Sequence, residues 1–130
     1  MTNKFIKYHL PVIFWASIIF LLCSTPGNKI PHVSWLELLS FDKFVHASVF
    51  FILNHLSIRA IYRQGKNSIY TVTAICVFYG GILEIMQSVL FEQRSGDVFD
   101  FIANSFGCIM AVMTFQSIKS KIQKRFNKSY

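Results

Sequence analysis

Asp97, Asp100 and Asn104 stand three and four residues apart at the start of a long apolar stretch. In a helix this spacing places the three side chains on one face, so a polar stripe enters a segment that otherwise suits hydrocarbon. Carboxylates in such surroundings can exchange protons or bind cations, and an amide can orient a ligand or a neighbouring side chain. These residues therefore predict a functional site.

Two further segments carry polar pairs at helical spacing, Asp42 with His46 and Glu84 with Gln87. Each pair projects from one face of its helix. With a rise of about 1.5 Å per residue, Glu84 and Asn104 lie at the same depth, roughly 10 Å from the ends of their helices. The sequence therefore predicts that the polar faces of three helices meet in one layer near a membrane surface.

If this layer is catalytic, Glu84 and Asp100 are the expected acid/base pair and His46 is the expected proton shuttle. Carboxylates and an imidazole can also hold a divalent metal that activates water, but no spaced motif such as H-E-x-x-H occurs. The questions of a metal and of any cofactor therefore stay open. If the layer binds a ligand instead, Arg94 is placed to hold a phosphate or carboxylate group. The ligand-binding candidates are Asp42, Lys43, Gln87, Arg94, Asp97 and Asn104.

A structural ion-pair network is the alternative explanation for the same residues. An acid inside a bilayer is costly unless it is paired, and Lys43 and Arg94 are available at the level of the aspartates. These two cations cannot neutralise all the carboxylates, and Glu84 lies deeper than either cation. The excess of acids favours a site for proton transfer or cation binding.

The elements that position these residues are long apolar stretches. Of the 130 residues, 53% are hydrophobic and 16% aromatic, which is unusual for a soluble globular domain. A membrane-spanning helix needs about 20 mostly apolar residues. Residues 24–41 predict a loop with a short interfacial helix around residues 35–39. We therefore expect an all-helical membrane four-helix bundle, with residues 1–130 as a single domain. The expected spans are residues 8–23, 44–61, 69–91 and 98–118.

The net charge of +7 is distributed unevenly. All 13 basic residues except Lys29, Lys43 and Arg94 lie on the side of the predicted bundle that carries both termini. Because basic loops stay in the cytoplasm, both termini are expected there, with the bundle in an inner (plasma) membrane. The polar layer then lies at the external surface. Nucleic acid is not an expected partner, because anionic lipid headgroups explain the basic tail at 119–130 more simply.

Five short segments hold most of the polar residues, and their order and spacing resemble a known family. These segments are Asp42-Lys43-Phe-Val-His46, Glu84-Ile-Met-Gln87, Arg94-Ser-Gly-Asp97, Asp100 and Asn104-Ser-Phe-Gly107. Over about residues 42–112 the chain resembles the VanZ-like family of small multi-pass membrane proteins. The resemblance implies four membrane-spanning helices and gives weight to the residues of these segments. The family's named member is associated with resistance to the glycopeptide teicoplanin.

Three functions stay open. The first is an envelope or glycopeptide (teicoplanin) resistance factor whose outer-leaflet site binds or modifies a lipid or a cell-wall precursor. The second is an acid/base or metal-assisted membrane hydrolase or transferase. The third is a structural scaffold held by an ion-pair network. The lipid bilayer is the expected surrounding partner, and the sequence leaves the substrate, the existence of a reaction and the oligomeric state open.

Overall fold

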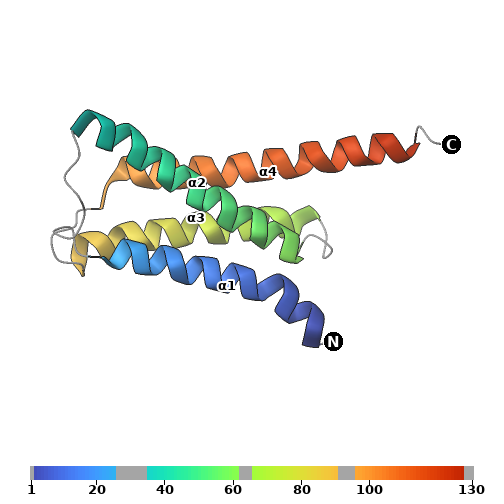
Figure 1. Cartoon of the computed structure of the whole chain (residues 1–130), viewed down its shortest axis with the longest axis horizontal. Helices are drawn as coiled ribbons and strands as arrows, with labels where there is room; N and C mark the ends of the chain where they lie inside the picture. Colours follow the sequence, from blue (N-terminus) through green and yellow to red (C-terminus); the bar gives the residue numbers. More distant parts are fainter. Residues whose placement is uncertain (1, 26–34, 62–65, 91–95, 128–130) are drawn as a thin grey trace.

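Four long helices make up almost all of the described structure (Figure 1). The structure is a computed structural model that describes residues 2–25, 35–61, 66–90 and 96–127. Successive helices run in opposite directions along the long axis of the molecule (Figure 1). The predicted all-helical, four-helix architecture is confirmed. The helices are α1 (Thr2–Ser24), α2 (Trp35–Ile61), α3 (Lys66–Val89) and α4 (Val98–Asn127).

Each helix contains a stretch that is long and apolar enough to cross a bilayer. The stretches are Ile6–Ser24, Phe41–Ile61, Ser68–Val89 and Val98–Lys121. Large apolar side chains such as Phe14, Phe78 and Ile109 are exposed around the bundle, where a soluble protein would present polar groups. The chain is therefore a multi-pass membrane protein.

Residues 35–39 do not form a separate interfacial helix, so that expectation is wrong. They are the first turns of α2, which continues without a break to Ile61. No proline or glycine interrupts the sequence between Trp35 and Ile61, so nothing in it ends the helix early. Asp42, Lys43 and His46 consequently lie within one continuous helix, which fixes their relative positions.

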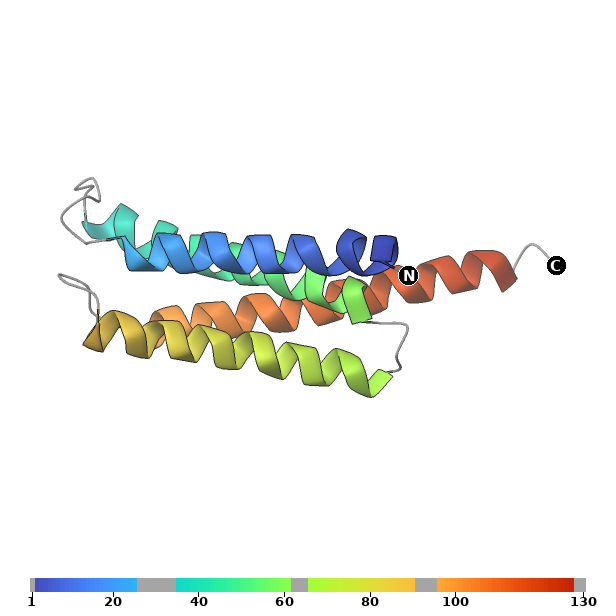
Figure 2. The same ribbon diagram turned by 90° about the horizontal axis from the view of Figure 1, so that it is seen from below.

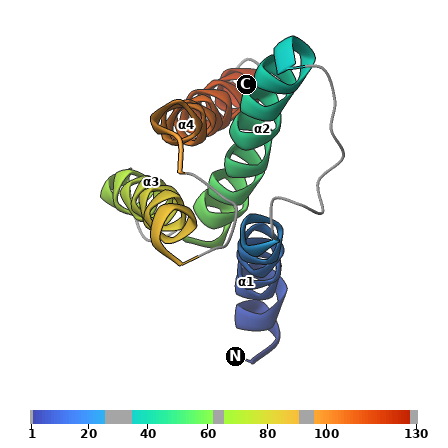
Figure 3. The same ribbon diagram turned by 90° about the vertical axis from the view of Figure 1, so that its left-hand side faces the viewer.

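α2 contacts the other three helices, and its packing against α4 is the most extensive in the bundle (Figure 3). A Cβ atom added at Gly107 of α4 would overlap the backbone carbonyl of Ala47, so glycine is needed where α2 and α4 touch. A Cβ atom at Gly80 of α3 would come within 3.1 Å of the Phe50 ring. These close approaches hold the three helices together directly below the predicted polar layer.

The two ends of the bundle differ. The site end is defined here as the end where α1 and α3 finish and α2 and α4 begin. Both chain termini lie at the opposite end, where α4 extends beyond the other helices (Figure 2). The predicted placement of the two termini on one side of the bundle agrees with this arrangement.

A second polar contact, which the sequence analysis missed, lies in the middle of the bundle. Asn54 of α2 is fully buried and donates hydrogen bonds to the Cys108 carbonyl at 2.8 Å and to Thr73 Oγ1 at 3.1 Å. The amide therefore links α2 to both α3 and α4 inside the apolar core, where a satisfied polar group adds specificity to the packing.

Candidate functional site

Asp97 stands immediately before α4 and caps its first turn. Its Oδ1 atom accepts a hydrogen bond from Phe99 N at 2.8 Å, and its carbonyl accepts one from Asp100 N at 3.0 Å. Its own N–H donates to Glu84 Oε2 at 3.1 Å. The ammonium group of Lys43 and the N–H of Phe99 lower the pKa of the Asp97 carboxyl group. Asp97 thus fixes the start of α4 against both α2 and α3.

The end of α3 is tied to the same turn through Ser88, which the sequence analysis did not count among the site residues. Ser88 Oγ donates to the Glu84 carbonyl at 3.0 Å and accepts a hydrogen bond from Gly96 N, also at 3.0 Å. A Cβ atom on Gly96 would collide with the Glu84 carbonyl, so only glycine fits this approach. The Gly-Asp pair before the apolar run is the sequence signal for this contact.

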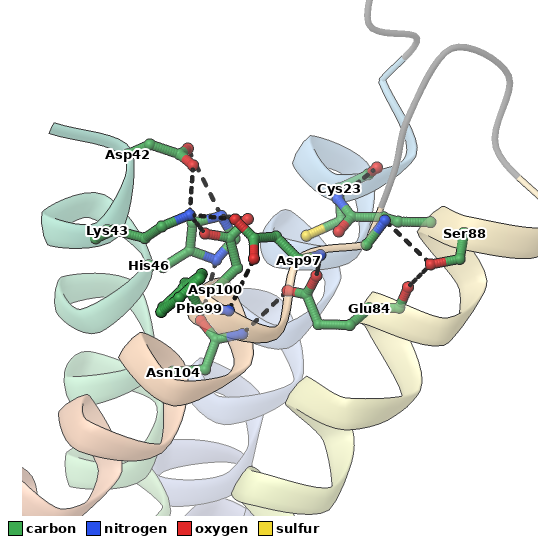
Figure 4. A network of polar contacts seen from close by, with 12 residues as sticks. Cys23, Asp42, Lys43, His46, Glu84, Ser88, Asp97, Phe99, Asp100 and Asn104 are labelled. Carbon is green, nitrogen blue, oxygen red and sulfur yellow. Dashed lines mark hydrogen bonds and ion pairs between the residues drawn. The ribbon is translucent and has the colours of Figure 1, made fainter. Parts of the chain in front are cut away.

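Lys43 is the centre of the ion pairs at the site end (Figure 4). Its ammonium group contacts Asp97 Oδ2 at 2.9 Å and Asp42 Oδ2 at 3.6 Å, and it also donates a hydrogen bond to Asp100 Oδ1. The side chain of Lys43 is only 25% exposed. One cation from α2 therefore holds three carboxylates, two of which belong to the start of α4.

His46 lies one turn below Asp42 and is oriented by Asn104 of α4. Its Nδ1 atom lies 3.0 Å from Asn104 Oδ1. Its Nε2 atom faces two carboxylates, at 3.7 Å from Asp42 Oδ1 and 3.7 Å from Asp100 Oδ2. The imidazole therefore has one nitrogen fixed by an amide and the other directed at a pair of acids.

Glu84 of α3 completes the layer at its deepest level. It is 8% exposed, and its carboxylate accepts hydrogen bonds from Asp97 N and, at 3.4 Å, from Asn104 Nδ2. Among the described residues no cation lies within 4.0 Å of this carboxylate. A continuous polar chain consequently runs from Glu84 through Asn104 to His46 and crosses three helices (Figure 4).

The structure brings seven of the predicted site residues into this polar layer. They are Asp42, Lys43, His46, Glu84, Asp97, Asp100 and Asn104. Gln87 is buried, but its amide turns toward α1 and donates to the Cys23 carbonyl at 3.3 Å. Arg94 lies outside the described residues. His55, on the same helix as His46, stacks on Phe51 far from the layer.

Two cavities and one apolar groove open onto this layer, and the sequence analysis did not predict their walls. A cavity of about 280 Å³ between α1, α2 and α3 is lined by Asp42, His46 and Gln87 on its polar side. A cavity of about 320 Å³ between α3 and α4 includes Glu84 and Asp97 in its lining. A groove of about 890 Å³ runs along α2 and α4. It is lined by Lys43, Phe44, Ala47, Asp97, Phe99, Ile102, Ala103 and Phe106.

The charges of the layer do not balance. Four carboxylates face one ammonium group and one imidazole in the described part of the chain. Such an arrangement can transfer protons through His46 or attract a cation. One set of potential metal-binding atoms stands out, because single ligand atoms of Asp42, His46 and Asp100 all lie within 4.8 Å of one another.

The comparison with known proteins finds one family that matches most of the chain. A model of the VanZ/LLP1 family matches residues 8–119, a range that includes most of all four helices and the whole polar layer. No curated protein and no solved structure matches the chain. Because the matched range covers most of the 130 residues, the chain belongs to the VanZ/LLP1 family.

Proposed function

We propose that this protein is an envelope factor whose polar layer binds the headgroup of a membrane lipid or lipid-linked cell-wall precursor. In a catalytic form of the proposal, the layer also modifies the headgroup. The single observation that carries the proposal is the position of the groove on α2 and α4. Lys43 and Asp97 form its polar end, and the rest of its wall is apolar. A groove of this kind suits a molecule with one charged end and one hydrocarbon end.

The surroundings of the groove support a lipid as the occupant. Phe44 and Phe106, on its two walls, are 68% and 57% exposed in the isolated chain. Both residues belong to membrane-spanning stretches, so their exposed side chains contact the hydrocarbon tails of lipids. A tail in the groove then leads its headgroup to Lys43 and the aspartates without leaving the bilayer.

The distribution of basic residues supports a position of the polar layer in the outer leaflet. All basic residues except Lys29, Lys43 and Arg94 fall, in the sequence, near the two termini or between the second and third spans, and the positive-inside rule favours a cytoplasmic position for these segments. The site end then faces the outer leaflet of a bacterial inner membrane, where cell-wall precursors are consumed. Protection against a glycopeptide such as teicoplanin is one outcome that altered precursors or lipids in this leaflet would produce.

A catalytic version of this function is the second candidate, and one observation favours it. Glu84 and His46 can each take up and release a proton, and Asn104 holds both side chains in place through its hydrogen bonds. Glu84→Gln keeps the size of the side chain and one of its two acceptor oxygens but cannot take up a proton. A hydrolase or transferase would lose turnover in this variant while still binding its lipid.

A structural role is the third candidate, because Lys43 already pairs with three acids. A purely structural protein needs no groove. Blocking the groove therefore distinguishes a structural role from lipid binding. Ala103→Phe fills the groove from α4. Ala74→Phe makes the same change in an apolar groove between α3 and α4 that lacks charged side chains.

The experiment is mass spectrometry of lipids that copurify with the full chain in mild detergent. We expect a lipid or precursor that is enriched over the bulk membrane with the wild type and with Ala74→Phe, and reduced about tenfold with Ala103→Phe. Equal lipid content in all three proteins, with no enriched species, would reject the binding function and favour a scaffold.

A further inference from the structure

We propose that Asp42, His46 and Asp100 bind a divalent transition-metal ion of the zinc or manganese class. The site lies between the start of α2 and the first turn of α4, beside the Lys43 ion pairs (Figure 4). It does not depend on the proposed lipid function, and it uses atoms that the ion pairs leave available.

Each aspartate uses one carboxylate oxygen for Lys43 and presents the other to His46. Lys43 contacts Asp42 Oδ2 and Asp100 Oδ1. The remaining oxygens, Asp42 Oδ1 and Asp100 Oδ2, each lie 3.7 Å from His46 Nε2. That distance is too long for a hydrogen bond. It is close to the separation of about 3.4 Å expected between two ligands on one tetrahedral ion with bonds near 2.1 Å.

The neighbouring hydrogen bonds determine which nitrogen of His46 carries its proton. The Glu84 carboxylate can only accept, so the Asn104 amide presents Nδ2 to Glu84 and Oδ1 to His46. His46 Nδ1 must therefore donate to Asn104, and a neutral imidazole then directs the lone pair of Nε2 at the two carboxylates. Metal-binding histidines are commonly oriented in this way, through a hydrogen bond from the nitrogen that does not bind the metal.

Three electron-rich atoms facing one another repel unless a cation lies between them. Asp100 is only 8% exposed, so water relieves the repulsion less than it would at a surface aspartate. The acids also outnumber the cations in the described layer. A second proton on His46 would supply one positive charge, whereas a divalent ion supplies two and contacts all three atoms.

The donor set limits the kind of metal. One imidazole nitrogen and two carboxylate oxygens suit zinc or manganese better than magnesium or calcium, which prefer oxygen ligands alone. Asp42 and His46 line the cavity between α1, α2 and α3, so the remaining coordination positions open into that cavity. If the proposed lipid function holds, a metal here would let an otherwise acidic layer accept a phosphate headgroup.

The test is a titration of the purified full chain in detergent, stripped of metal with a chelator, against Zn²⁺. Co²⁺ serves as a second probe because its visible absorption reports coordination by protein ligands. We expect one ion per chain, and a loss of affinity of at least 100-fold in Asp42→Asn and in His46→Gln. Asn104→Leu, which releases the imidazole, should weaken binding about 10–100-fold.

The matched control is His55→Gln, which removes a histidine from the same helix but outside the layer. It should bind Zn²⁺ like the wild type. Helix content and thermal unfolding of each variant identify failures to fold. Metal binding to the wild type tests the proposal without any variant. Absence of stoichiometric Zn²⁺ and Co²⁺ binding to the folded wild type, or unchanged binding in folded His46→Gln, would overturn the proposal.

Discussion

His46 Nδ1 lies 3.0 Å from Asn104 Oδ1, so an imidazole on α2 and an amide on α4 meet although the two residues are far apart in the sequence. The same amide donates to Glu84 on α3. Asn104 therefore connects the three helices of the polar layer through its side chain, and its substitution tests the geometry of that layer.

Replacing Asn104 with leucine should destabilise the bundle, because the change removes one hydrogen bond from His46 on α2 and one from the buried Glu84 on α3. A buried polar group left unsatisfied costs about 1–3 kcal/mol, so we expect a clear fall in the temperature of thermal unfolding in detergent. Ser105→Ala is the control, since Ser105 Oγ donates only within its own helix, to the Phe101 carbonyl. Equal unfolding temperatures for the two variants would show that the Asn104 contacts contribute little.

Gly107→Ala should be strongly destabilising, because the added methyl group would overlap the Ala47 carbonyl and force α2 away from α4. Overpacking of this kind costs about 1–3 kcal/mol. Gly81→Ala introduces the same methyl group where the nearest atom is 3.4 Å away on the Phe101 ring, which is ordinary contact. Thermal unfolding of the two variants side by side checks the prediction, and a Gly107→Ala protein as stable as Gly81→Ala would contradict the described helix packing.

Asp97 has two separable roles, as the cap of α4 and as a partner of Lys43. Asp97→Asn keeps an oxygen that can cap the helix but removes the charge, whereas Asp97→Ala removes both. We therefore expect the alanine variant to be less stable than the asparagine variant by about 1 kcal/mol. Thermal unfolding at neutral pH measures the difference, and an asparagine variant no better than alanine would argue against capping.

The stability provided by the Asp97 charge should depend on pH. Lys43 and the Phe99 N–H lower the pKa of Asp97, so the ionised form stabilises the folded state. This contribution is fully present above the pKa of the unfolded chain, about 4, and disappears as the pH falls through the lower pKa of the folded state. The wild type should be more stable than Asp97→Asn at pH 7, by under about 1 kcal/mol because the side chain is 40% exposed. A stability gap that stays constant down to the lowest pH tolerated would contradict this assignment.

The orientation of the chain can be tested with a reporter fused after Tyr130. The distribution of basic residues predicts a cytoplasmic C-terminus. A reporter that is active only in the cytoplasm should therefore be active, and one that needs export should be silent. The opposite result would place the polar layer on the cytoplasmic side and exclude an outer-leaflet ligand.

The sequence predicts the depth of the polar residues well, because depth depends only on the regular rise of a helix. Glu84 and Asn104, expected at one level, are hydrogen-bonded in the structure. The sequence does not predict which of two neighbouring helices a polar side chain will hydrogen-bond to. Gln87 shares a face with Glu84, but its amide bonds to α1, and that choice depends on how α1 packs against α3.

The groove could not be predicted either, since it lies along α2 and α4, which cross closely at Ala47 and Gly107. Small residues at this crossing indicate a close approach, but not its angle. Lys43 was expected at the level of the aspartates, whereas its simultaneous contact with three of them depends on that angle.

The most direct measurement compares envelope lipids and cell-wall precursors, by mass spectrometry, in cells lacking the protein and in cells restored with wild type or Glu84→Gln at equal abundance. We expect a lipid or precursor species that accumulates without the protein and returns to its normal level with the wild type. If that species still accumulates in the Glu84→Gln strain, the layer is catalytic. If its level returns to normal in that strain, the layer is a binding site. Identical lipids and precursors in all three strains would contradict the proposed envelope function.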